Sequence, residues 1–152
     1  MDREACRTEI ATHMMGLVSQ VERYMAAGAR DYNFGAQRMA LIQVAETFST
    51  LLEEPAQQEG AAHVLCEAMF GDKEPPADFW ATETGRAVAL AIGYPRPLCP
   101  RPMVERILSP LSRQRVGEMI KLGKLTEVIE DGQRYVTASS VKERMRVKVA
   151  GQ

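Results

Sequence analysis

The sequence predicts a mainly α-helical protein with a small β-hairpin near its C-terminus. Two observations carry this prediction. Apolar side chains recur every three or four residues over most of the chain, as on the buried face of a helix. Strand-like segments rich in β-branched and aromatic residues occur only on either side of Asp131-Gly132, a strong hairpin-turn signal. We therefore expect an all-helical N-terminal half and a C-terminal half of helices plus one hairpin.

The N-terminal half is predicted to form three helices. The first runs from Arg3 to Ala27 and is broken by Gly28, the second runs from about Gly35 to Glu54, and the third runs from Ala56 to Phe70 and is closed by Gly71.

The first two of these helices each carry one apolar stripe. The stripes consist of Ile10, Met14, Leu17, Val21 and Tyr24 in the first helix and of Leu41, Val44, Phe48, Leu51 and Leu52 in the second. Such stripes are typical of helices that pack nearly parallel or antiparallel to a partner. The core of three such helices is modest, so two interpretations remain open: a self-contained three-helix bundle, or a homodimer formed through these N-terminal helices.

Lys73-Glu74-Pro75-Pro76 is the predicted boundary between two domains, residues 1–74 and 77–150, because consecutive prolines cannot continue a helix. The charges divide at the same place. Residues 1–75 carry a net charge of −6, and residues 76–152 carry +5. A basic half can displace counterions from a phosphate backbone, so any contact with double-stranded DNA is expected there.

The C-terminal half is predicted to begin with a supporting helix and an arm. Asp78 is expected to cap a helix that runs through Trp80 to Ile92, with Trp80 in the core. Residues 93–102 contain four prolines together with Arg96 and Arg101, which indicates a stiff extended segment. This arm could lie along a DNA backbone, or it could be a rigid connector with solvated arginines.

A helix, a turn and a second helix are predicted next, between Met103 and Gly123. Ser112 can cap the second helix, whose buried face is formed by Val116, Met119 and Ile120. Gly123 can adopt the left-handed conformation that ends this helix, after which Leu125 returns to the core.

The hairpin follows, with strands at Thr126–Ile129 and Gln133–Val136. Ser140 and Glu143 match a capping box that starts a last helix, whose apolar residues are Val141, Met145 and Val149. A helix, a turn, a helix and a hairpin in this order predict a winged helix-turn-helix.

The C-terminal third of the chain resembles the DNA-binding domain of the MerR and excisionase-like families. The resemblance rests on Ser112-Arg113-Gln114-Arg115-Val116, on Gly123-Lys124-Leu125, on the hairpin and on Ser139-Ser140-Val141. It implies that the second helix enters the major groove while the wing touches the adjacent backbone or minor groove. The residues expected to contact DNA are Ser112, Arg113, Gln114, Arg115, Gly117, Glu118, Lys121, Lys124, Arg134 and Arg101.

Enzymatic motifs are missing from the sequence, so neither an enzyme nor a cofactor is expected. His63 and Cys66, which Cys6 and His13 could join, have a weak metal-like spacing; ordinary packing is the preferred interpretation, and no metal is predicted. Three cysteines are too few for a disulfide framework, and neither a signal peptide nor an apolar run of membrane-spanning length is present. We therefore expect a cytoplasmic protein without membrane contact.

The function predicted from these features is that of a sequence-specific transcriptional regulator of bacterial, phage or plasmid type. Repression through occupation of an operator is the preferred mode, and the sequence identifies neither the operator nor an effector. Two alternatives stay open. One is a phage DNA-packaging recognition subunit similar to a small terminase, and the other is a protein–protein interaction module without DNA binding.

Overall fold

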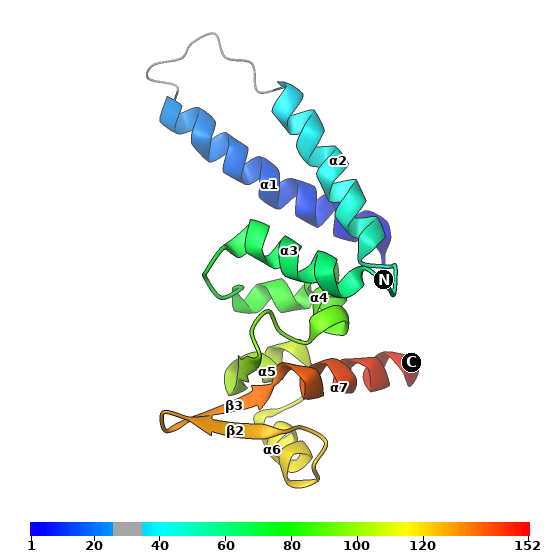
Figure 1. Ribbon diagram of the computed structural model, residues 1–152, viewed down its shortest axis with the longest axis vertical. Helices are drawn as coiled ribbons and strands as arrows, with labels where there is room; N and C mark the ends of the chain where they lie inside the picture. Colours follow the sequence, from blue (N-terminus) through cyan, green and yellow to red (C-terminus); the bar gives the residue numbers. More distant parts are fainter. Residues whose placement is uncertain (26–34) are drawn as a thin grey trace.

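The computed structural model describes residues 1–25 and 35–152 of the chain (Figure 1). The described part is mainly helical and contains one three-stranded antiparallel sheet, as the sequence predicted in outline. The expected end of the first helix at Ala27 and its break at Gly28 lie outside the described residues, as does the side chain of Tyr24.

Helices α1 (Arg3–Met25) and α2 (Gly35–Leu51) lie side by side at one end of the molecule (Figure 1). Ile10 and Met14 of the predicted α1 stripe are buried, but Leu17 and Val21 are 44% and 49% exposed. The seam is therefore covered only in the half of α1 that is nearer to the rest of the protein.

Helix α3 (Gln58–Phe70) follows and ends, as predicted, at Gly71, whose φ is +59°. The single helix expected to start at Asp78 is instead two elements, the 3-10 helix η1 (Ala77–Ala81) and helix α4 (Glu83–Ile92). The predicted cap was wrong because Thr82 has extended backbone angles and its Oγ1 accepts a hydrogen bond from the Gly85 amide at 2.9 Å. Trp80 is buried, as predicted.

Helix α4 is the centre of the fold, since it contacts α1, α3, α5 and α7. The carboxylate of Glu9 on α1 accepts hydrogen bonds from the amides of Glu83 and Thr84 at 3.1 and 2.8 Å and from the Thr84 hydroxyl at 2.6 Å. At the other end of α4, a Cβ on Gly93 would lie 2.0 Å from the carbonyl oxygen of Ala138. Both ends of this helix are thus fixed by close polar or backbone contacts.

The sheet has the strand order β1-β3-β2, with β1 at Leu98–Pro100, β2 at Glu127–Glu130 and β3 at Gln133–Thr137. Strand β1 pairs antiparallel with β3, so that Cys99 lies opposite Val136, and both side chains are fully buried. The stiff extended conformation predicted for residues 93–102 is confirmed at Leu98–Pro100, but this segment is not a projecting arm. Its middle is a strand of the sheet, and its end belongs to the next helix.

Helices α5 (Arg101–Ile107) and α6 (Arg113–Lys121) are joined by a short turn, and α6 leads to the β2–β3 hairpin. The cap at Ser112 is confirmed, because its side chain accepts a hydrogen bond from the Arg115 amide at 3.2 Å. The hairpin turn is confirmed as well. Asp131 and Gly132 both have positive φ, +50° and +76°, as the tightest hairpin turns require.

Helix α7 (Ala138–Ala150) begins earlier than the sequence predicted. Its cap is Thr137, whose Oγ1 accepts from the Ser140 amide at 3.4 Å, so the capping box proposed for Ser140 and Glu143 was wrong. Ser140 instead accepts a hydrogen bond from the Thr126 amide at 3.1 Å, which holds α7 to the start of the hairpin. Val149, expected in the core, is exposed.

One continuous buried cluster extends from Cys6 on α1 to Met145 on α7. A chain of aromatic contacts crosses the predicted boundary at residues 75–76: Phe70 contacts Phe79, which contacts Trp80, with ring centroids 4.9 and 5.1 Å apart. The segments 1–74 and 77–150 are therefore packed against each other through a shared core.

We predict that Glu9→Gln lowers the free energy of unfolding by about 1 to 2 kcal/mol, because the amide loses both a charge at a helix N-terminus and one acceptor oxygen. Chemical denaturation of the full chain measures this effect. Glu67→Gln, on an exposed part of α3, is the matched control and should be neutral. Equal stability of the two variants would mean that Glu9 does not fix α4.

Candidate nucleic-acid interface

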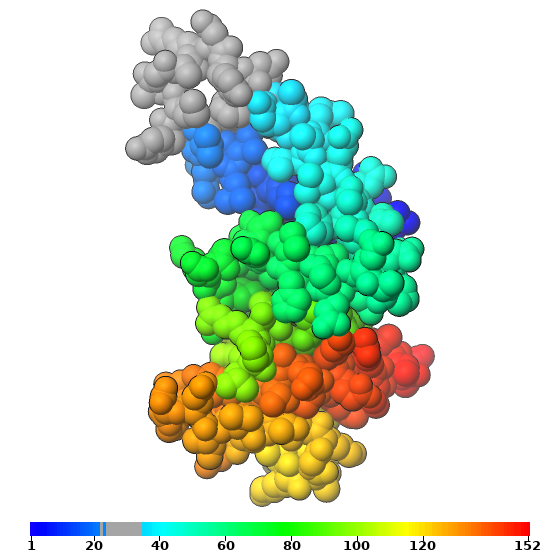
Figure 2. Space-filling model, in the orientation of Figure 1, coloured from blue at the N-terminus to red at the C-terminus, as the bar shows by residue number. Residues whose placement is uncertain are grey.

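Helix α6 has one buried face and one exposed polar face. Val116 and Met119 are buried against the core, and Ile120 is partly buried. The outer face carries the residues that the sequence predicted there. Arg113, Gln114, Arg115 and Lys121 are exposed, while Gly117 and Glu118 are half-buried. In Figure 2, α6 and the hairpin form the end of the molecule opposite to α1 and α2.

The charges on this face are partly paired. Glu118 accepts from Arg115 at 2.7 Å and from Gln114 at 3.5 Å. Within residues 1–25 and 35–152, no hydrogen bond or ion pair engages the side chains of Arg113, Lys121 or Lys124. These three cations are therefore available to an external anion, whereas Arg115 is already neutralised and Ser112 is used as the helix cap.

Arg101 was predicted to lie on a free arm, but it lies instead between α5, α6 and β2. Its Nη1 is 3.6 Å from the Glu127 carboxylate, and its Nη2 would be 3.1 Å from a Cβ on Gly117. Gly117 thus leaves space for the Arg101 guanidinium. The same Glu127 carboxylate is 3.8 Å from Nη1 of Arg134 on β3. One acidic side chain therefore joins the helix pair to the hairpin.

The hairpin presents both signs of charge. Arg134 on β3 is largely exposed, and so are Glu130 and Asp131 at the turn. Ile129 lies directly opposite Arg134 in the β2–β3 register and is 65% exposed. The exposure of Ile129 was missed at the sequence level. The adjacent pair Val128-Ile129 contained the signal, because neighbouring strand residues point to opposite faces and both cannot be buried by the same core.

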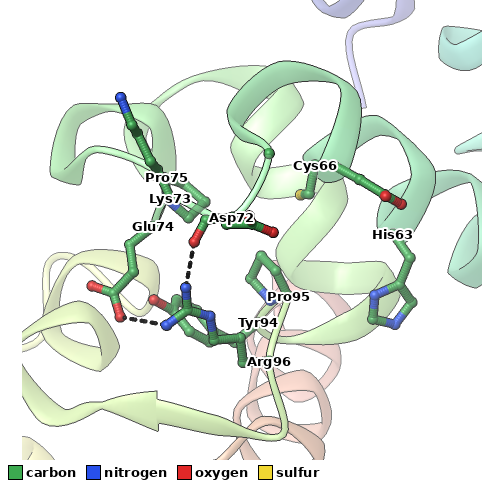
Figure 3. Close-up of a pocket in the computed structure, with 11 residues that line it drawn as sticks. His63, Cys66, Asp72, Lys73, Glu74, Pro75, Tyr94, Pro95 and Arg96 are labelled. Carbon is green, nitrogen blue, oxygen red and sulfur yellow. Dashed lines mark hydrogen bonds and ion pairs between the residues drawn. The ribbon is translucent and has the colours of Figure 1, made fainter.

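A separate hollow of about 350 Å³ lies between the end of α3 and the segment before β1 (Figure 3). Arg96, predicted on the arm, donates to the Asp72 carbonyl at 2.6 Å and pairs with Glu74 at 3.5 Å. Burial raises the pKa of the Tyr94 hydroxyl, which has no hydrogen-bond partner in the described part of the chain. Arg96 is therefore engaged in holding the 72–74 loop and is not free for DNA.

The residues considered as metal ligands are not brought together. His13 Nε2 lies 3.0 Å from the Met69 carbonyl oxygen, and Cys6 contacts Thr84. His63 and Cys66 both line the hollow of Figure 3, where Cys66 is buried and His63 is exposed. Among the described residues, no group of three or more His, Cys, Asp or Glu side chains is placed to hold a metal ion.

Compared with known protein families, with curated proteins and with solved structures, the chain matches none. None of the helices within residues 1–25 and 35–152 is long and apolar enough to cross a bilayer. The geometry of α6, its turn and the hairpin is therefore the main indication of function.

Buried thiols give the stability a pH dependence. Burial raises the pKa of Cys66 from 9.0 to about 12 and also raises the pKa values of Cys6 and Cys99. Unfolded thiols ionise near pH 9.0 while the folded Cys66 stays protonated up to about pH 12, so stability is full below pH 9.0 and falls across that window.

We predict that the free energy of unfolding, measured under reducing conditions, declines between pH 8 and pH 10.5, and that Cys66 contributes about 2 kcal/mol of this decline. Cys66→Ala should decline less steeply than the wild type, because one ionising group is removed from the unfolded state. Parallel pH curves for the two proteins would contradict this assignment to Cys66.

Proposed function

We propose that this protein is a sequence-specific double-stranded-DNA-binding regulator, acting as a repressor, which binds through α6 and the β2–β3 hairpin. The observation that carries the proposal is the outer face of α6, which is polar and exposed and contains unpaired cations. The β2–β3 hairpin of the sheet follows α6 directly in the chain. The element order α5, turn, α6, β2 and β3 supports a winged helix-turn-helix arrangement.

The chemistry of the α6 face fits base readout. An α-helix fits the major groove, where arginine pairs with guanine, glutamine pairs with adenine and a carboxylate can accept from cytosine. Arg113 and Gln114 on the first turn are assigned to bases, and Glu118 to a base or to the orientation of Arg115. Lys121, Lys124 and Arg134 are assigned to phosphates, where they position the helix without reading sequence.

The acidic groups near the site limit the number of cations that can contact phosphates. Glu127 already neutralises part of Arg101 and Arg134, and Glu130 and Asp131 stand at the hairpin turn. The wing is therefore expected to approach the backbone through Arg134, with the two turn carboxylates directed away from the duplex. The regulator is proposed to need no cofactor and to act in the cytoplasm.

A homodimer is proposed through the outer halves of α1 and α2. Three large apolar side chains are exposed there, on the helix segments nearest residues 26–34: Leu17, Val21 and Met39. Val44, just past the middle of α2, is exposed as well. An exposed apolar patch of this kind is characteristic of a protein–protein contact. A dimer formed at this end would leave α6 of both copies free for the two half-sites of a palindrome.

Base readout and phosphate contact can be told apart with two duplexes of equal length, one enriched from a random library and one of random sequence. Arg113→Ala should weaken binding to the enriched duplex by about 1 to 3 kcal/mol and to the random duplex by less. Arg134→Ala should weaken binding to both alike and reduce the slope of log K against log salt by about 0.9. Fluorescence anisotropy at several salt concentrations measures both effects.

Arg146→Ala is the matched control, because it removes the same charge from an exposed site on α7 and should change neither quantity. Equal losses on both duplexes for Arg113→Ala would argue against base readout. An unchanged salt slope for Arg134→Ala would make the wing a structural hairpin only. If the wild type binds no duplex even at low salt, the protein is an interaction module and the proposal fails.

Sedimentation should find the full chain as a dimer, and Val21→Glu should weaken the dimer at least about tenfold by placing a charge in the apolar contact. Val64→Glu, at an exposed valine on α3, should leave the dimer intact. A wild-type chain that stays monomeric at high concentration would contradict the proposed dimer. A ring-like oligomer would favour a DNA-packaging recognition subunit.

A further inference from the structure

A second hollow, of about 460 Å³, lies between α4, the end of α5 and α7. This volume is within the range of pockets that bind small molecules. The hollow reaches the turn between α5 and α6, since Ser109 and Pro110 are part of its wall. It is therefore adjacent to the proposed DNA-reading helix but separate from its outer face.

Cations from three different elements surround this hollow. Arg86 comes from α4, Arg106 from α5 and Lys148 from α7. Arg86 is paired with Glu83 at 3.0 Å, whereas no ion pair engages Arg106 in the part of the chain that the structure describes. Burial and the nearby charge of Arg86 lower the pKa of the Lys148 ammonium. The rim thus carries a positive charge that the protein itself does not balance.

The acidic neighbours do not remove this excess. Glu83 is the one carboxylate side chain among the residues that line the hollow, and it is shared with Arg86. Asp78 lines a separate hollow together with Arg106, but the two side chains form no ion pair. Among the lining side chains, three cations therefore surround one carboxylate, an excess that is suited to an anionic guest.

The interior of the hollow is largely apolar. Its walls include Ala87, Leu90, Ile107, Pro110, Met145 and Val149. Trp80 also lines it; the residue is 2% exposed, and its indole Nε1–H has no hydrogen-bond partner within residues 1–25 and 35–152. A free inorganic ion or a DNA phosphate would leave these apolar walls uncovered, so the guest must carry an apolar part.

We propose that this hollow binds a small amphipathic organic anion, with its carboxylate or phosphate group between Arg106 and Lys148 and its hydrocarbon part against Leu90, Ile107 and Met145. An effector site of this kind would regulate the DNA binding proposed above, and that regulatory part rests on the proposed function. The ligand site itself does not.

A direct contact connects the hollow to α6. Lys148 Nζ donates a hydrogen bond to the carbonyl oxygen of Ser109, in the turn three residues before the Ser112 cap. An anion that binds Lys148 competes with this carbonyl for the ammonium. The turn then loses a tether to α7, and the orientation of α6 relative to the hairpin changes.

Octanoate is the probe for the ligand site, and octanol and inorganic phosphate are the two comparisons. Trp80 is the single tryptophan of the chain, so its fluorescence reports on the hollow, and calorimetry gives the affinity independently. Octanoate should bind the full chain, while octanol and phosphate should each bind at least about tenfold more weakly, because each lacks one half of the recognition. Equal binding of octanol would refute the charge recognition, and equal binding of phosphate would refute the apolar part.

Variants locate the bound anion. Arg106→Gln, at an exposed side chain that is not expected to affect folding, and Lys148→Met should each reduce octanoate affinity about tenfold or more. Arg146→Gln, an exposed cation on α7 that does not line the hollow, is the matched control and should bind as the wild type does. Unchanged affinity of Arg106→Gln would place octanoate elsewhere and overturn the assignment.

A last experiment tests the proposed regulation separately from the ligand site. Octanoate at saturation should lower the affinity for the enriched duplex at least about threefold in the wild type and have no effect in Lys148→Met. If octanoate binds without changing the affinity for DNA, the proposed regulation is wrong and the proposed ligand site stands. If no duplex binds at all, the proposed function fails, while the octanoate titration still decides the pocket.

Discussion

The burial of α4, with its N-terminal amides bonded to Glu9, is the constraint on which the rest of the structure depends. This helix is too short and too apolar to be stable at a surface, and seven of its ten residues are buried. A buried helix N-terminus leaves backbone amides without partners, and the Glu9 carboxylate from α1 satisfies two of them. The N-terminal helices are therefore more than an appended assembly unit, because they complete the hydrogen bonding of the helix that supports the C-terminal half.

Close backbone packing at the other end of α4 fixes the position of the elements that form the candidate interface. Gly93 allows α4 to meet the first turn of α7, and the Ala138 amide donates to the Pro97 carbonyl at 2.9 Å. These contacts set where β1 runs, and β1 in turn holds β3 and the hairpin. The distance between hairpin and α6 is then fixed by the Arg101–Glu127–Arg134 cluster, for which Gly117 leaves room.

Sequence reasoning predicted the features that depend on short-range signals. The Ser112 cap, the end of the helix near Gly123 and the Asp131-Gly132 turn follow from a few adjacent residues, and the structure has all three. The pairing of β1 with β3 was missed because its partners are almost 40 residues apart and the prolines suggested an arm. That pairing also explains the wrong cap of α7. It extends β3 to Thr137, so Thr137 and not Ser140 stands at the helix start. The candidate DNA-contacting face was predictable, whereas the ion pairs that occupy Arg101 and Arg115 depend on the tertiary fold.

The strand order β1-β3-β2 makes β2 an unpaired edge, and exposed edges invite pairing with another chain. In a symmetric antiparallel contact between two copies of this four-residue strand, Glu127 of each copy would face Glu130 of the other. Like charges directly opposite each other across strands are destabilising. The same two carboxylates that reduce the positive charge of the hairpin thus oppose edge-to-edge aggregation, in spite of the exposed Ile129 between them.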